Sequence, residues 1–105
     1  MRPRFFFCLL WFFSLSACAA HSYRIHGNEV TLVLRRPDAK SVMLATSLDG
    51  FNLQPAAAVS HAWAVTLPAD KGFRYFYQVD GEIVVPDCAL KERDDFGSEN
   101  CIFEP

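Results

Sequence analysis

The feature that most constrains the fold is a strict apolar alternation that ends in a hairpin turn. Phe73, Tyr75, Tyr77 and Val79 recur at every second position of FRYFYQV. A period of two is typical of a β-strand with one buried face. Asp80 and Gly81 follow at once, and then the apolar segment EIVV. Asp-Gly between two such segments is a strong hairpin signal, so the sequence predicts two antiparallel strands joined at this turn.

The same alternation predicts further strands and no helix. It recurs in the segments at residues 30–34, 42–44 and 63–67, with turn residues between them. We also expect a possible first strand at residues 22–26 and a last strand at residues 100–104. Residues 56–59 are undecided, and residues 86–99 are expected to form a long loop. Short strands at this spacing indicate an all-β, antiparallel sandwich.

The N-terminus has the features of an export signal. Arg2 and Arg4 form a basic head, residues 5–13 are continuously apolar, and small residues precede Cys18. This is the layout of a secretory signal. The apolar run is too short for a helix that spans a bilayer, which requires about 20 residues.

Residues 15–18, LSAC, resemble the lipobox of bacterial lipoproteins. The resemblance implies that residues 1–17 are removed and that Cys18 becomes the acylated N-terminus. Stable anchoring takes two or more acyl chains. The resemblance also implies sorting to the outer membrane, facing the periplasm, because Ala19 is not aspartate. The alternative is an ordinary signal peptide that is cut near Ala19 or Ala20, with Cys18 lost.

Removal of the signal leaves 88 residues, which we divide into a lipid-anchored tether at 18–28 and one domain at 29–105. Without Arg2 and Arg4, 8 basic residues face 12 acidic ones, a formal charge of −4. A chain of this charge lacks the basic surface that nucleic-acid binding requires. We therefore expect no nucleic-acid partner. The lipid anchor would bind the chain to the membrane, and the expected partner is an envelope protein or a glycan.

The four cysteines separate by position. Cys8 lies in the signal and Cys18 is assigned to the lipid, which leaves Cys88 and Cys101. Disulfides form and persist outside the cytoplasm, so we expect these two to be bridged. Such a bridge closes a loop of about 14 residues and contributes about 3 kcal/mol. The alternative is a pair of buried free thiols.

The order of the segments resembles the family 48 carbohydrate-binding modules, which include the glycogen-binding module of the AMP-activated protein kinase β subunit. The resemblance covers residues 29–104. It is carried by RRPDAKSVMLA, SLDGFN, the strand with Trp63, the hairpin FRYFYQVDG and the segment DFGSEN. It implies an immunoglobulin-like sandwich of the early-set type, in agreement with the strand pattern.

The resemblance also implies a set of ligand-binding residues. In the family an α-glucan lies on two tryptophans, with a lysine, an asparagine and an apolar loop residue beside them. Phe51 and Ile83 stand at the two tryptophan positions and Phe76 at the lysine position. Phe96 stands at the apolar loop position, and Asn100 is the one identical residue. These five residues are the candidate ligand-binding set.

Strand alternation places Phe76 on the face opposite Tyr75. If Phe51 and Ile83 lie beside it, the outer sheet carries an apolar patch, and such patches commonly mark interaction sites. The alternative is that Phe76 packs beneath a loop. We expect a protein-interaction or scaffold module at the cell envelope, with a glucan- or glycan-binding lipoprotein as the alternative.

Catalytic and metal-binding patterns are absent from the sequence. It contains no catalytic serine–histidine–aspartate order, no glycine-rich phosphate loop and no cysteine set at metal-ligand spacing. His21 and His26 are expected to be solvated in the tether. The acidic residues between positions 87 and 99 are expected to form a solvated loop. We therefore expect a protein that is not an enzyme and that holds no cofactor and no metal.

Overall fold

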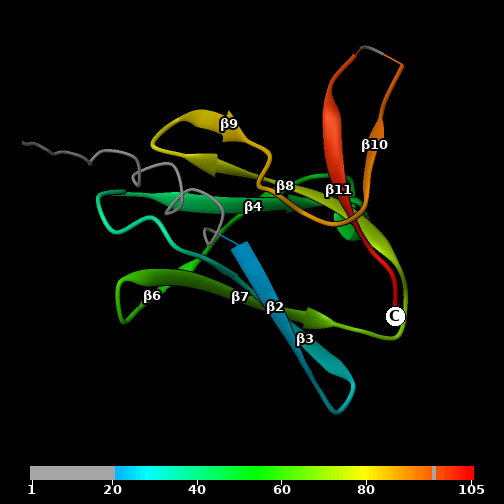
Figure 1. Ribbon diagram of the computed structural model, residues 1–105, viewed down its shortest axis with the longest axis horizontal. Helices are drawn as coiled ribbons and strands as arrows, with labels where there is room; N and C mark the ends of the chain where they lie inside the picture. Colours follow the sequence, from blue (N-terminus) through cyan, green and yellow to red (C-terminus); the bar gives the residue numbers. More distant parts are fainter. Residues whose placement is uncertain (1–20, 96) are drawn as a thin grey trace, which may run out of the picture.

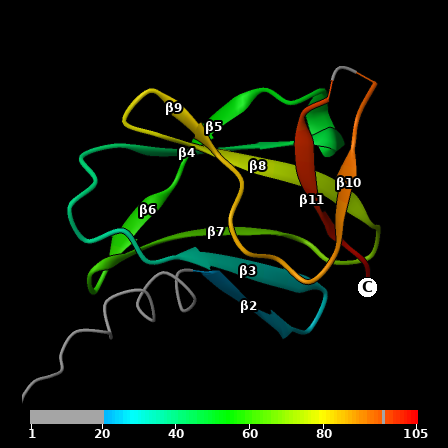
Figure 2. The same ribbon diagram turned by 45° about the horizontal axis from the view of Figure 1, so that its top comes forward.

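The computed structural model describes residues 21–95 and 97–105 (Figure 1). The expected signal peptide, Cys18 and Phe96 lie outside these residues. The described chain forms two antiparallel sheets that pack as an immunoglobulin-like sandwich, and Figure 2 shows them as two layers. This confirms the predicted all-β class. The described residues contain no helix that is long and apolar enough to cross a membrane.

The smaller sheet has four strands and the larger has six. In the smaller sheet the order is β2 (His21–His26), β3 (Glu29–Leu34), β7 (Ala62–Pro68) and β6 (Ala57–Val59). In the larger sheet the order is β10 (Lys91–Arg93), β11 (Glu99–Phe103), β8 (Phe73–Val79), β4 (Val42–Thr46) and β5 (Leu53–Pro55), and β9 (Glu82–Val84) pairs with β8. A short 3-10 helix, η1 (Ser47–Asp49), follows β4.

Strand β8 organises the larger sheet. One of its edges pairs with β4 from Tyr75 to Val79. Its other edge is shared, because Phe73 to Tyr75 pair with β11 and Tyr77 to Val79 pair with β9. The predicted hairpin at Asp80 and Gly81 is confirmed, with φ values of 49° and 87° at these two residues. Positive φ at both central residues is the requirement of a type I′ turn.

The core lies between the two sheets and consists of the residues that the alternation assigns to the inner faces. In β8 the first, third, fifth and seventh residues are buried, and the residues between them are exposed or half-buried. Leu32, Leu34, Leu44 and Tyr77 are almost completely buried. Burying a side chain of this size stabilises the fold by about 1.5–3 kcal/mol. Because these residues of β8 point inward, Arg74, Phe76 and Gln78 between them point to the outer face of the sheet.

Three segments differ from the sequence-based expectation. Residues 53–55 lie among the expected turn residues and form a strand, β5, which pairs with β4. The expected loop at residues 86–99 contains a strand, β10, which pairs with β11 to form a hairpin. The possible first strand is confirmed and begins at His21, so part of the segment that we assign to the tether is an edge strand paired along β3. In each of these places the strand is paired with a neighbouring strand of its sheet.

The Cys88–Cys101 disulfide is present, with the two Cα atoms 5.9 Å apart. This geometry supports the expected bridge rather than the alternative of two free thiols. Cys101 is completely buried on β11, and its register partner on β8 is Tyr75. The bridge holds the segment after β9 against the end of the sandwich core.

Candidate ligand-binding face

A shallow groove of about 290 Å³ lies on the outer face of the larger sheet. We call it the outer-face groove. Strand β8 contributes two of its residues, because positions 74 and 76 point away from the core that holds Tyr75 and Tyr77. The other residues come from the turn after η1 and from the β10–β11 hairpin. The groove is lined by Phe51, Arg74, Phe76, Glu92, Asp94 and Asn100.

One side of the groove is a pair of stacked aromatic rings. The ring centroids of Phe51 and Phe76 are 5.9 Å apart, and the ring planes differ by 13°. Phe51 reaches this position through a local turn, in which its backbone N–H donates to the carbonyl of Thr46 at 2.7 Å. Its φ of 65° lies in the left-handed region, which bulky residues rarely adopt. Such a conformation costs about 1–3 kcal/mol and often occurs at functional sites.

The other side of the groove is polar. Arg74 on β8 forms an ion pair with Glu92 on β10. The backbone N–H of Ser98 donates to the Asp94 carboxylate at 3.0 Å, which orders the tip of the β10–β11 hairpin. Asn100 lies opposite Glu92 in the strand register. The groove therefore combines an apolar ring surface with charged groups and an amide.

Asn100 is the most informative residue of the polar side. It is only 7% exposed, yet its side-chain amide has no hydrogen-bond partner among residues 21–95 and 97–105. Buried polar groups are almost always paired, and leaving one unpaired costs about 1–3 kcal/mol. Because this amide lines the groove, it is available to hydrogen-bond a ligand there.

The structure brings three of the five predicted ligand residues together. Phe51, Phe76 and Asn100 all line the outer-face groove. Ile83 is opposite Gln78 in the register of β9 and β8, and it is 68% exposed on the same face without lining the groove. Phe96 lies outside the described residues. Phe76 is half-buried on the outer face of β8. Its ring stacks on that of Phe51, so the segment after η1 covers it in part.

Sequence reasoning missed the charged residues of the groove. Arg74 lies on the outer face of a strand that the alternation predicts, so its position could have been predicted from the pattern. The positions of Glu92 and Asp94 could not have been predicted, because they depend on β10, which has no apolar alternation. Among the described residues, Glu92 and Asp94 thus belong to an ordered hairpin rather than to a solvated loop.

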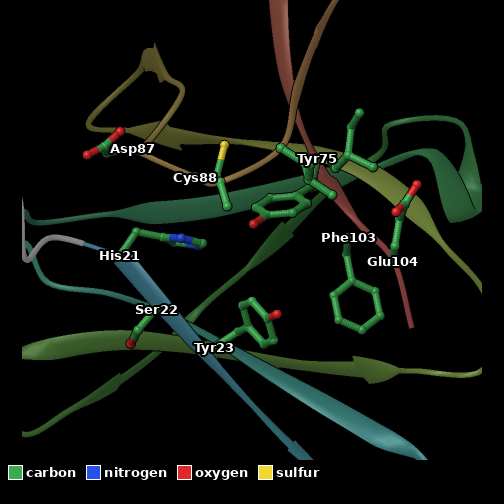
Figure 3. Close-up of a pocket in the computed structure, with 11 residues that line it drawn as sticks. His21, Ser22, Tyr23, Tyr75, Asp87, Cys88, Phe103 and Glu104 are labelled. Carbon is green, nitrogen blue, oxygen red and sulfur yellow. The ribbon is translucent and has the colours of Figure 1, made fainter.

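A second cavity of about 320 Å³ opens at the end of the sandwich, between β2 and the segment around the disulfide (Figure 3). We call it the end cavity. His21 and Tyr23 line it from β2, and Tyr75 lines it from β8. The Nε2 atom of His21 is 3.2 Å from the hydroxyl of Tyr77, and its ring is 5.7 Å from that of Tyr75. The ring of Tyr23 meets Phe103 edge to face.

Burial of these aromatic residues changes their acid–base behaviour. Burial lowers the pKa of His21 to about 4, so its imidazole is neutral at pH 7. Burial, with a smaller effect of Tyr23, raises the pKa of Tyr75 to about 12. Burial also raises the pKa of Tyr77, with a smaller effect of Tyr75. The expectation that His21 is solvated is therefore wrong, because the ring packs against the tyrosines.

Neither cavity resembles a metal centre. Within residues 21–95 and 97–105, no group of three or more His, Cys, Asp and Glu side chains is arranged to hold a metal ion. Comparison with known proteins adds no assignment. No protein-family model matches the sequence, and no curated protein matches it.

Proposed function

We propose that this chain is a lipid-anchored envelope protein without enzymatic activity, whose outer-face groove binds a glycan. The observation that supports this most strongly is the buried amide of Asn100, which no described residue pairs, beside the stacked rings of Phe51 and Phe76. This arrangement changes the order of our two expectations, which placed a protein partner before a glycan.

The chemistry of the groove suits a sugar. A sugar ring has an apolar face of C–H groups, which packs on an aromatic ring, and hydroxyl groups at its edge. An asparagine amide offers two N–H donors and one carbonyl acceptor, so it pairs with hydroxyls of either role. No residue among 21–95 and 97–105 pairs the Asn100 side chain, so a sugar hydroxyl in the groove would add a hydrogen bond that these residues do not supply.

The charged residues of the groove suit binding better than proton transfer. Glu92 is ion-paired with Arg74, and the Asp94 carboxylate accepts a backbone hydrogen bond from Ser98. Both carboxylates are thus held in place as acceptors for hydroxyl groups. An arginine beside them adds donors in a fixed planar arrangement. These three charged residues orient a ligand and require no chemical step.

The test is affinity electrophoresis of the full protein through gels that contain soluble α-glucan. We expect the wild type to be retarded and Phe76→Ala to migrate as in a glucan-free gel. Ile83→Ala is the matched control, because Ile83 lies on the same face outside the groove. Wild type that migrates identically with and without glucan would refute α-glucan as the ligand. Equal loss of retention in Ile83→Ala and Phe76→Ala would refute the groove as its site.

A protein partner is the second candidate, because of a separate observation. Ile83 and Leu53 are large apolar residues that are exposed on strands of the larger sheet. Exposed apolar residues that form a contiguous patch commonly mark contacts with proteins. Under this alternative Ile83→Asp abolishes capture of the partner from envelope extract and leaves glucan retention unchanged. The two variants at positions 76 and 83 therefore separate the two functions.

A further inference from the structure

The end cavity is surrounded by exposed apolar residues that the proposed glycan site does not use. Tyr23 is 54% exposed although it lies on the face of β2 that also carries His21. Ile25, two residues further along the same face, and Leu90, across the cavity, are about half-exposed. Strand β2 is an edge strand of the smaller sheet, so the opposing sheet covers this face only in part. We call Tyr23, Ile25 and Leu90 the open edge.

The position of the open edge in the chain suggests what covers it. Only two residues separate Cys18 from His21, which lines the end cavity. A fully extended chain spans at most about 3.3–3.6 Å per residue, so the two Cα atoms are at most about 11 Å apart. An acylated Cys18 has its chains in the bilayer. It therefore holds the end cavity at the membrane surface, whatever the conformation of the residues between them.

The charges of the end cavity indicate which lipids it suits. Asp87 and Glu104 are among its lining residues, while none of the described lining residues is a lysine or an arginine. His21 adds no positive charge at pH 7, because burial keeps its imidazole neutral. This surface attracts the ammonium group of a zwitterionic headgroup and repels an anionic lipid. Tyrosine is well suited to the boundary, since its ring is apolar and its hydroxyl is polar.

We propose that the open edge rests on the surface of a bilayer of zwitterionic lipid, with the ammonium groups of the headgroups beside Asp87 and Glu104. The proposal rests on the acylation of Cys18 that is part of the proposed function. Tyr23 and Leu90 enter the interface between headgroups and acyl chains. Strand β6, at the other edge of the smaller sheet, faces away from the membrane.

The test is fluorescence quenching of single tryptophans by brominated phosphatidylcholine. The acylated full protein is reconstituted in phosphatidylethanolamine and phosphatidylcholine vesicles, with Trp63→Phe to remove the tryptophan of β7. Tyr23→Trp or Leu90→Trp supplies the reporter, and both positions are exposed, so the fold tolerates the change. Val59→Trp, on β6, is the matched control. We expect at least two-fold quenching at positions 23 and 90 and none at position 59.

The outcomes separate the anchor from the docking. Vesicle flotation is measured on the same samples. A protein that does not float refutes the acyl anchor, and the docking proposal with it. A protein that floats but shows equal quenching at positions 23 and 59 overturns the docking alone. Replacing half of the lipid with phosphatidylglycerol should reduce quenching at position 23 in the wild-type background and not in Asp87→Asn/Glu104→Gln. Deeper quenching with the anionic lipid would overturn the zwitterionic preference.

Discussion

Neighbouring residues on β8 should differ greatly in what they contribute to stability. Tyr75 is 2% exposed and packs against the rings of Phe73, His21 and Tyr77. Truncating a buried aromatic to alanine costs about 3–5 kcal/mol. Because Tyr75 already borders the end cavity, little structure is available to fill the space, and we expect Tyr75→Ala to cost at least about 3 kcal/mol.

Phe76, the next residue, lies on the outer face and loses much less. Its main aromatic contact is the ring of Phe51, and a pair of this kind is worth about 0.5–1.5 kcal/mol beyond its buried area. Including its partial burial, we expect Phe76→Ala to cost about 1–2 kcal/mol. Urea denaturation with a common m-value measures both. In a domain of this size 1 kcal/mol shifts the melting temperature by about 4–8 °C, so the two variants are easily distinguished. Equal losses would refute the assignment of the two side chains to opposite faces.

Three further results are expected. Cys18→Ser should abolish metabolic labelling with a palmitate analogue, and equal labelling of wild type and variant would refute the lipid anchor. Reduction of the Cys88–Cys101 disulfide should lower the free energy of unfolding by about 3 kcal/mol, as measured by urea denaturation with and without reductant; an unchanged midpoint would contradict this. The unfolded state binds more protons at His21 between its ordinary pKa of 6.5 and its folded pKa of about 4, so stability should be complete above pH 6.5 and fall as the pH approaches 4. The full pKa shift corresponds to about 3 kcal/mol, and we expect about 1–2 kcal/mol because the ring is only part-buried. The variant His21→Phe should lose this pH dependence of stability. An identical pH profile in wild type and variant would refute the assignment to His21.

The sequence predicts the strands of both sheets whose inner face is apolar. In β8 and β3 the period of two follows burial residue by residue, and the turn at Asp80 and Gly81 fixes the register of β9. Asp80 also has a role that the turn pattern does not reveal. Its carboxylate accepts hydrogen bonds from the backbone N–H groups of Lys40 and Ser41, which fastens the hairpin to the segment before β4.

The remainder of the fold depends on contacts between distant segments. Strand β10 reads Lys-Glu-Arg, without an apolar alternation, and it is a strand only because β11 provides hydrogen-bond partners. His21 was expected to be solvated because nothing in its neighbours along the chain indicates that Tyr75 and Tyr77 lie beside it. In each case the determining partner lies far away in the sequence.

The candidate site was predicted in part. The alternation placed Phe76 on the outer face, and the resemblance supplied Phe51 and Asn100, but neither indicated that the Asn100 amide would be buried without a partner. Asn100 lies on β11 opposite Glu92 of β10, where it is 7% exposed and lines the groove. The charged half of the groove likewise exists only once the β10–β11 hairpin has formed.

The central claim is that the buried amide of Asn100 serves a ligand, and Asn100→Leu tests it most directly. Leucine has nearly the same shape but no polar atoms, so the variant removes the cost of the unpaired amide. We expect its free energy of unfolding to rise by about 1 kcal/mol in urea denaturation, while its retention in the α-glucan gel falls to that of Phe76→Ala. Wild-type retention by Asn100→Leu, or a loss of stability in this variant, would contradict the account.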